Sequence, residues 1–171
     1  MIKAILATGL NGEIGQNGDM PWGRSLPKDL EYFKKATSDG SVILMGSTTH
    51  QSLPFFPKGF PKRKNYVVTS NGRGEQKSGV IKLTLSHFER CYNTGGSVFN
   101  YFGTWVVGGA SIYEQLWHMV DEVHLTTVYE SYPTADTFFK PDLSDFEMIG
   151  EPINVSGEDL GAIVQVWRRV Q

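Results

Sequence analysis

Short apolar segments separated by polar stretches dominate the pattern of this chain. Several are rich in Val, Ile, Leu and Trp, and their length is typical of strands that are buried on at least one face. They cover residues 2–7, 42–45, 66–69, 105–107, 123–128 and 163–167. Segments with apolar residues at helical spacing lie between them, at 27–36, 85–92 and 110–118. This alternation predicts an α/β fold with a mostly parallel sheet.

The carboxyl-terminal part of the chain has a different pattern. Segments 146–155 and 161–170 flank a turn-like cluster at 156–159 that reads Ser-Gly-Glu-Asp. Two apolar segments around such a cluster predict an antiparallel hairpin at one edge of the sheet. The chain has 171 residues, which is about the length of one domain, and it shows no repeat and no linker. We therefore expect a single domain over residues 1–171.

Two long stretches lack a regular pattern. Residues 10–26 contain four glycines and the sequence Met20-Pro21-Trp22. A loop of this length inside a compact domain is uncommon and is often the lid of an active site. Residues 54–63 contain three prolines and predict a rigid, extended surface loop.

Composition excludes several classes of protein. Hydrophobic residues make up 40% of the chain and the net charge is −2, which argues against a disordered chain and against a general nucleic-acid binder. Cys91 is the only cysteine, so no intramolecular disulfide is possible, and a reducing compartment such as the cytoplasm is expected. We interpret residues 1–10 as a first strand rather than a signal peptide, and no apolar segment is long enough to span a membrane.

Asp29 is the first candidate for chemistry. It falls in the first turn of the helix predicted at 27–36, its neighbours at helical spacing are apolar, and Trp22 precedes it closely. Burial would raise the pKa of this carboxyl. A partly buried carboxylate can accept two hydrogen bonds from a flat N–H edge and can support proton delivery. Position alone equally fits an acid that stabilises a helix start.

Two strand-to-helix junctions could bind phosphate. One is Val107-Gly108-Gly109-Ala110-Ser111, and the other is Gly46-Ser47-Thr48-Thr49. Glycines allow a ligand to approach the backbone, and free N–H groups at a helix start attract anions. A tight turn and simple helix capping are the structural alternatives. Two such junctions on one sheet favour a dinucleotide over a mononucleotide.

The remaining polar groups suggest little chemistry. Arg63 lies in a basic run that is either a solvated surface or a carboxylate-binding group at the rim of a cleft. The four histidines lack metal-ligand spacing, so we expect no metal site, and His124 is expected to face outward from its strand. The serines lack a Gly-x-Ser-x-Gly elbow, and Cys91 is interpreted as a packing residue.

Taken together, the motifs resemble those of the dihydrofolate reductase family, in the same order over about residues 2–140. They are Asn11-Gly12-x-Ile14-Gly15, Met20-Pro21-Trp22, Leu26-Pro27-x-Asp29-Leu30-x-x-Phe33-Lys34, Met45-Gly46-x-x-Thr49, Arg63-Lys64-Asn65, Val107-Gly108-Gly109-x-x-x-Tyr113 and Leu125-Thr126. The resemblance implies an eight-stranded, mostly parallel sheet with flanking helices. It also implies NADPH-dependent reduction of 7,8-dihydrofolate to tetrahydrofolate, with hydride passing to pterin C6 and a proton to N5.

The resemblance also implies a set of site residues. Asp29 would hold the pterin 2-amino and ring N–H groups, Thr126 would assist it, Arg63 would pair with the glutamate α-carboxylate, and a lid at 10–26 would close over the nicotinamide. The implied catalytic residues are Asp29, Trp22, Met20 and Thr126. The implied substrate-binding residues are Ile5, Leu30, Phe33, Leu53, Arg63, Val107 and Tyr113. The implied cofactor-binding residues are Ala7, Ile14, Gly15, Gly46, Ser47, Thr48, Thr49, Thr69, Ser70, Gly108, Gly109, Ala110, Ser111 and Ile112, with a cis bond between the two adjacent glycines.

The chain departs from the family pattern in several places. The lid is longer by about two residues at 23–25, and residues 94–103 look like an insertion. Ser47 and Thr48 replace the basic residues that often bind the 2′-phosphate in the family, and Ser111 stands at a further position where a basic residue is common. Thr69, Ser70 or Arg73 would have to bind the 2′-phosphate instead. Two alternatives remain: a pyrimidine reductase of riboflavin synthesis on the same fold, and a binding protein without turnover. We expect a monomer with thymidylate synthase as its metabolic partner and no nucleic-acid or membrane partner.

Overall fold

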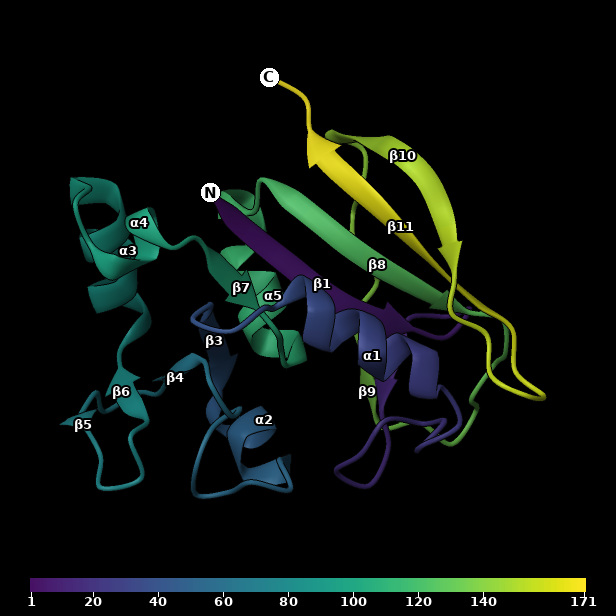
Figure 1. Ribbon diagram of the computed structural model, residues 1–171, viewed down its shortest axis with the longest axis horizontal. Coiled ribbons are helices and arrows are strands. Elements are labelled where there is room, and N and C mark those ends of the chain that lie inside the picture. Colours follow the sequence, from purple (N-terminus) through teal and green to yellow (C-terminus); the bar gives the residue numbers. More distant parts are fainter.

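A nine-stranded sheet forms the centre of the computed structural model, which describes residues 1–171 (Figure 1). Its strands in chain order are β1 Ile2–Thr8, β3 Val42–Gly46, β4 Lys64–Val68, β5 Gly74–Glu75, β6 Ile81–Leu83, β7 Thr104–Val106, β8 Glu122–Val128, β10 Phe146–Asn154 and β11 Ala162–Arg169. Their order across the sheet is β10-β11-β8-β1-β7-β3-β4-β6-β5. The fold is α/β, as the sequence predicts.

The strand pairings confirm a mostly parallel sheet with an antiparallel end. β1, β3, β4, β6, β7 and β8 pair in parallel along the centre of the sheet. β11 is antiparallel to β8 and to β10, so the predicted hairpin forms one edge. The ninth strand, which the resemblance did not imply, is β5, a two-residue segment antiparallel to β6. β5 and β6 are too short to give a periodic signal in the sequence.

The helices are α1 Pro27–Ala36, α2 Ser47–Ser52, α3 Leu85–Thr94, α4 Val98–Tyr101 and α5 Ala110–Leu116. The helix predicted at 110–118 ends earlier, because the chain tightens into a 3₁₀ turn at Trp117–Met119. The insertion at 94–103 contains α4. Phe99 anchors this short helix in the core, with its ring 4.8 Å from the rings of Phe88 and Tyr66.

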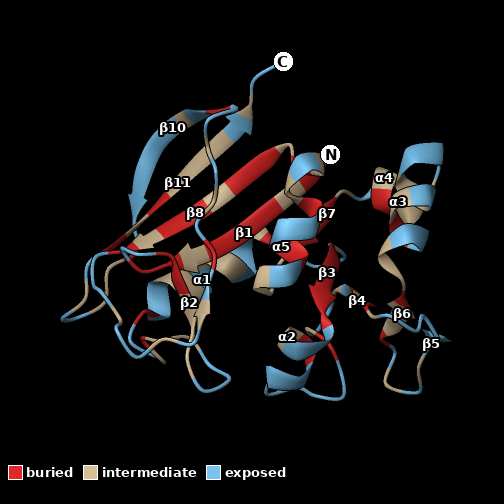
Figure 2. Cartoon of the chain, turned by 180° about the vertical axis from the view of Figure 1, so that it is seen from behind, coloured by how far each residue is buried: buried red, intermediate tan, exposed pale blue.

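The two faces of the sheet are covered by different helices (Figures 1 and 2). Side chains of β1 point alternately to the two faces of the sheet, as the period of two in a strand requires. Ile2 and Leu6 belong to the larger core, which also contains α3, α4 and α5. Ile5 packs on the opposite side against residues of α1, including Phe33. Figure 2 shows the central strands β1, β3, β7 and β8 as the most buried part of the fold.

The segment 10–26 is more ordered than the sequence suggests. Within it, β2 Glu13–Gly15 pairs with β9 Thr137–Phe138 in a second, two-stranded sheet. Glu13 is buried, and its carboxylate accepts the backbone N–H of Asn11 and of Tyr132. Burial alone would raise the pKa of Glu13, but these N–H groups hold it below its ordinary value. The base of the predicted lid is thereby tied to the loop before β9.

The helices are all short. None of them is both long and apolar enough to cross a bilayer.

Candidate active site

A cavity of about 1640 Å³ lies where the central parallel strands end. Residues at the carboxyl ends of β1, β3, β4 and β7 line it, together with α1 and the starts of α2 and α5. Ligands of open α/β sheets bind outside the carboxyl ends of the strands, so the fold itself predicts this position. The volume exceeds the several hundred cubic ångströms of an ordinary single-ligand pocket, so two ligands can lie side by side.

Asp29 lies in the wall of this cavity, in the first turn of α1. Pro27 starts the helix at a position where its missing N–H costs nothing. From β8, the hydroxyl of Thr126 donates to Oδ1 of Asp29 at 2.6 Å. Burial raises the pKa of Asp29, and the hydrogen bond from Thr126 opposes part of this rise. The carboxyl keeps its second oxygen for a ligand.

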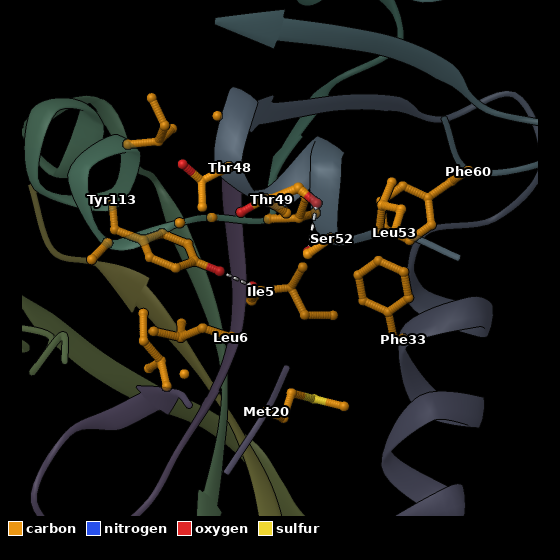
Figure 3. A pocket seen from close by; sticks show the side chains of 18 of the residues that line it. Ile5, Leu6, Met20, Phe33, Thr48, Thr49, Ser52, Leu53, Phe60 and Tyr113 are labelled. Atoms are coloured by element: carbon orange, nitrogen blue, oxygen red, sulfur yellow. Dashed lines mark hydrogen bonds between the residues drawn. The ribbon is translucent and has the colours of Figure 1, made fainter. Parts of the chain in front are cut away.

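Apolar side chains from α1 and from the segment after α2 form a slot of aromatic and aliphatic groups in the cavity (Figure 3). Phe33 projects from α1, while Leu53 and Phe60 come from the segment after α2. The ring centroids of Phe33 and Phe60 are 5.3 Å apart. Sequence reasoning missed Phe60, because it lies in a proline-rich loop without periodicity. Such a slot suits a flat ring system followed by an apolar spacer.

Glycines bring the backbone close to the cavity on the opposite wall. The bond between Gly108 and Gly109 is cis, as the resemblance implied. Gly108 has a φ of +114°, and a Cβ there would lie 3.3 Å from the ring of Tyr113. A Cβ on Gly46 would lie 2.9 Å from Cγ1 of Ile112, a distance that real Cβ atoms essentially never show. These positions therefore need glycine for close approach of the chain.

Tyr113 closes this wall from α5 (Figure 3). Its hydroxyl donates to the carbonyl oxygen of Ile5 at 2.7 Å, so the ring is fixed to the middle of β1. Burial raises the pKa of this phenol far above its ordinary value, and the group is neutral throughout the physiological range.

A band of hydroxyl groups lines the cavity around the starts of α2 and α5. Its members are Ser47, Thr48, Thr49, Thr69, Ser70 and Ser111. The Oγ1 of Thr69 is buried without a hydrogen-bond partner. Arg73, proposed from the sequence as a phosphate contact, is absent from the lining. The lining cations are Arg24, Lys34, Lys62 and Arg63, which come from the lid, α1 and the loop after α2.

Arg63 lines the cavity and also braces the fold. Its guanidinium donates to three backbone carbonyls, those of Thr37 at 2.7 Å, Lys34 at 2.9 Å and Pro61 at 2.9 Å. A longer contact of 3.5 Å reaches Asp39. A guanidinium has five N–H donors, so these contacts leave a donor of Nη2 free for an incoming acceptor.

The cavity unites nearly all of the residues implied by the resemblance. All of the substrate-binding and cofactor-binding residues named above line it, as do Asp29, Met20 and Thr126. Trp22 lies behind the wall instead, in a separate cluster with Leu26 and Val128, and its ring centroid is 5.7 Å from that of Tyr132. The indole N–H of Trp22 is buried without a partner.

The structure adds lining residues that sequence reasoning did not select. Besides Phe60, they include Tyr32, Thr84, Ser86 and Gln115. Tyr32 could have been selected, because it follows Asp29 by three positions and so shares its face of α1. The sequence could not have pointed to Thr84, which caps α3, or to Ser86. Both follow β6, and neither β6 nor its place beside β4 was predicted.

The fold and the site together define a class: an α/β enzyme whose cleft has room for a dinucleotide beside a second, flat ligand at a partly buried carboxyl. A family model described as dihydrofolate reductase matches residues 1–163. The chain belongs to the dihydrofolate reductase family. The pyrimidine reductase considered above is therefore set aside.

Comparisons with individual proteins agree with the family. The chain is 32% identical over 149 residues to the dihydrofolate reductase of Bacillus subtilis, covering 87% of this chain and 82% of the relative. It is 30% identical over 172 residues to dihydrofolate reductase type 9 of Escherichia coli, covering 97% and 92%. Among solved structures, it is similar to Enterococcus faecalis dihydrofolate reductase complexed with NADP(H) and RAB-propyl. That match has a TM-score of 0.80 and 26% identity, and covers 100% of this chain and 97% of the other.

Proposed function

We propose that this chain reduces 7,8-dihydrofolate to 5,6,7,8-tetrahydrofolate with NADPH. Family membership supports this reaction. The observation that carries it is the partly buried Asp29, paired with Thr126 at the end of an apolar slot in a cavity large enough for cofactor and substrate. The carboxyl accepts the N–H groups of the pterin edge, and the slot excludes the water that would compete with hydride transfer.

The residues around the glycine wall fit NADPH. Gly46, Gly108 and Gly109 allow close approach, and the unpartnered hydroxyl of Thr69 offers a hydrogen bond to a polar ligand group. Ala7, Ile14 and Tyr113 would flank the nicotinamide, and the hydroxyl band around Ser47 would hold the phosphates. When bound, the cofactor supplies the hydride that pterin C6 accepts.

Asp29 serves the proton side of the reaction. Because burial raises its pKa, the carboxyl keeps a proton at a higher pH than an exposed aspartate does. The pterin and the carboxyl then share protons within one hydrogen-bonded system. N5 receives its proton from this system through a water molecule. Thr126 orients the carboxyl by its bond to Oδ1, which leaves Oδ2 for the substrate.

The rest of the substrate follows the slot to its cationic end. Leu30, Phe33, Leu53 and Phe60 would hold the pterin and the benzoyl ring. Arg63 would receive the glutamate α-carboxylate through its free Nη2 donor, while its carbonyl contacts keep the guanidinium in place. Met20 would close over the reacting rings as part of the lid, and Trp22 would support the lid from behind.

The 2′-phosphate of NADPH would meet hydroxyls rather than cations. Ser47, Thr48, Thr69 and Ser70 line the cavity in this region. We also propose a monomer in the cytoplasm with thymidylate synthase as its metabolic partner. The single thiol, Cys91, is compatible with that compartment.

A product assay tests the proposed reaction. The protein is incubated with dihydrofolate and NADPH, and the folate product is identified by chromatography against authentic tetrahydrofolate. Stoichiometric formation of tetrahydrofolate and NADP⁺ is expected. A folded protein that binds both ligands and forms no tetrahydrofolate would be a binding protein, and the proposal would be wrong.

A further inference from the structure

Two hydrogen bonds connect α1 to β8 side by side. One is the Thr126–Asp29 bond described above. The other joins the hydroxyl of Tyr32 and Nδ1 of His124 at 2.6 Å. Asp29 and Tyr32 are three positions apart on a helix, and His124 and Thr126 are two apart on a strand, so each pair shares a face. The prediction that His124 faces outward is wrong, since its side chain is only 12% exposed.

The second bond continues into a chain of polar groups. Nε2 of His124 lies 2.7 Å from Oε1 of Glu122, the next residue along the same face of β8. Arg168 of β11 donates to Oε2 of Glu122 at 3.0 Å, and Nζ of Lys3 of β1 lies 3.7 Å from Oε1. The chain therefore runs from the cavity, which Tyr32 lines, to two cations at the far end.

Glu122 determines the direction of every hydrogen bond in this chain. Burial would raise its pKa, but the bonds from His124 and Arg168 hold it below the ordinary value, so the group is a carboxylate. A carboxylate only accepts hydrogen bonds, so Nε2 of His124 must carry a hydrogen. Burial lowers the pKa of His124, so the ring is neutral near pH 7 and its Nδ1 is an acceptor. Tyr32 must then be the donor.

The direction of the chain has a consequence for the cavity. Tyr32 donates its only hydroxyl hydrogen to His124, so its oxygen can only accept hydrogen bonds from a ligand. The hydroxyl of Thr126 likewise donates its hydrogen to Asp29. When Asp29 is ionised, Asp29, Thr126 and Tyr32 thus present acceptors alone at the polar end of the slot. Such an arrangement selects a ligand edge made of N–H donors and rejects one that carries acceptors.

We propose that His124 and Glu122 are positioning residues that hold the Tyr32 hydroxyl as an obligate acceptor, and that Tyr32 thereby helps to recognise the N–H-rich edge of the ligand bound at Asp29, directly or through one water. The identity of that ligand as a pterin rests on the proposed function. The direction of the chain does not, because it follows from Tyr32, His124 and a Glu122 carboxylate that Arg168 helps to keep ionised.

The variant Glu122→Gln tests the direction. An amide can donate to Nε2 of His124 while its oxygen still accepts from Arg168, so the ring hydrogen can move to Nδ1 and the Tyr32 bond can reverse. The measurement is the ¹⁵N chemical shifts of the His124 ring in the ligand-free protein near pH 7. The neutral wild-type ring is expected to be protonated at Nε2, and the Glu122→Gln ring at Nδ1. Glu151→Gln, an exposed change on β10, is the control and should match wild type.

Ligand binding tests the consequence. A 2,4-diaminopyrimidine protonated at N1 is the probe, because N1–H and the adjacent 2-amino group form an edge of N–H donors. Tyr32→Phe keeps the ring and removes the acceptor, so the probe should bind roughly threefold to tenfold more weakly. Glu122→Gln should weaken it similarly, because the reversed Tyr32 hydroxyl then points a hydrogen at a donor. NADPH affinity should stay unchanged in both variants.

Two results would overturn the proposal: a neutral wild-type His124 protonated at Nδ1, or unchanged probe affinity in Tyr32→Phe. Both can be measured even if Glu122→Gln fails to fold. Failure of the proposed function would look different. The ring shifts and the probe affinities would follow the pattern above, while the wild-type protein would form no tetrahydrofolate.

Discussion

The hydroxyl of Thr126 donates to Oδ1 of Asp29 at 2.6 Å, although the two residues are 97 positions apart in the sequence. This bond joins the first turn of α1 to strand β8 and fixes which carboxyl oxygen faces the cavity. It also lowers the pKa of a group whose pKa burial raises, so the net rise is a balance of two opposing effects.

Removing the hydroxyl of Thr126 should shift that balance. In Thr126→Val the carboxyl loses a hydrogen bond that favours its charged form, so the pKa of Asp29 should rise further. The midpoint of the pH–rate profile for hydride transfer should move to higher pH, measured by single-turnover oxidation of NADPH. Thr127→Val changes the neighbouring residue, which faces the other side of β8, and should leave the midpoint in place. A midpoint that moves down in Thr126→Val would show that the bond does not act on the carboxylate.

Burial of Asp29 should also cost stability. The pKa of Asp29 is higher in the folded state than in the unfolded state. Its contribution to the free energy of unfolding is therefore fully present below the unfolded pKa of about 4 and is lost as pH rises through the folded pKa. Asp29→Asn does not titrate and avoids that loss. Its melting temperature relative to wild type should therefore increase as the pH is raised from 4 to 8, measured by calorimetry. A constant difference across this range would contradict the raised pKa.

Arg63 should contribute to both affinity and stability. Arg63→Ala leaves the carbonyls of Thr37, Lys34 and Pro61 without their donor and should destabilise the fold by about 1–3 kcal/mol. Dihydrofolate should bind roughly tenfold to a hundredfold more weakly, because a charge-assisted pair is lost.

Urea unfolding and a binding titration separate the two effects of Arg63→Ala. Lys62→Ala removes a neighbouring cation whose side chain is 75% exposed, and it should be nearly neutral in stability. Loss of stability in Arg63→Ala with unchanged folate affinity would leave Arg63 as a structural residue only.

Gly46 should tolerate no side chain. In Gly46→Ala the new Cβ would lie 2.9 Å from Cγ1 of Ile112, which is itself buried and has little room to move. Overpacking of this kind costs about 1–3 kcal/mol, and the displaced α5 start should weaken NADPH binding. Gly161→Ala is the control, since its Cβ would meet Tyr129 at an ordinary 3.5 Å. Equal NADPH affinity in the two variants would remove Gly46 from the cofactor site.

The sequence predicted those parts of the molecule whose signal is local. Pro27, Asp29 and Phe33 lie on one short helix, so their relation could be derived from helical spacing alone. Thr126 entered the site only through the family resemblance, because no local pattern tells which strand faces α1. His124 shows the same limit: the period of two in β8 predicts alternation, but not which of the two faces packs against Tyr32.

Irregular segments account for the remaining differences. Phe60 lines the slot from a loop without periodicity, and Glu13 anchors the lid through a strand of three residues. Arg63 was expected to meet the substrate, and its three carbonyl contacts could not be foreseen because they depend on how α1 ends beside that loop. Tertiary contacts of this kind leave no repeat in the sequence.

The pH dependence of hydride transfer in wild type and Asp29→Asn tests the central claim most directly. NADPH oxidation is followed by loss of the reduced-nicotinamide absorbance after dihydrofolate is added, with both ligands saturating. The wild-type rate should fall as pH rises through the raised pKa of Asp29. Asp29→Asn should bind NADPH normally but react about 10²–10⁴-fold more slowly at neutral pH, with no such titration. Coincident profiles of the two proteins would contradict the role of Asp29.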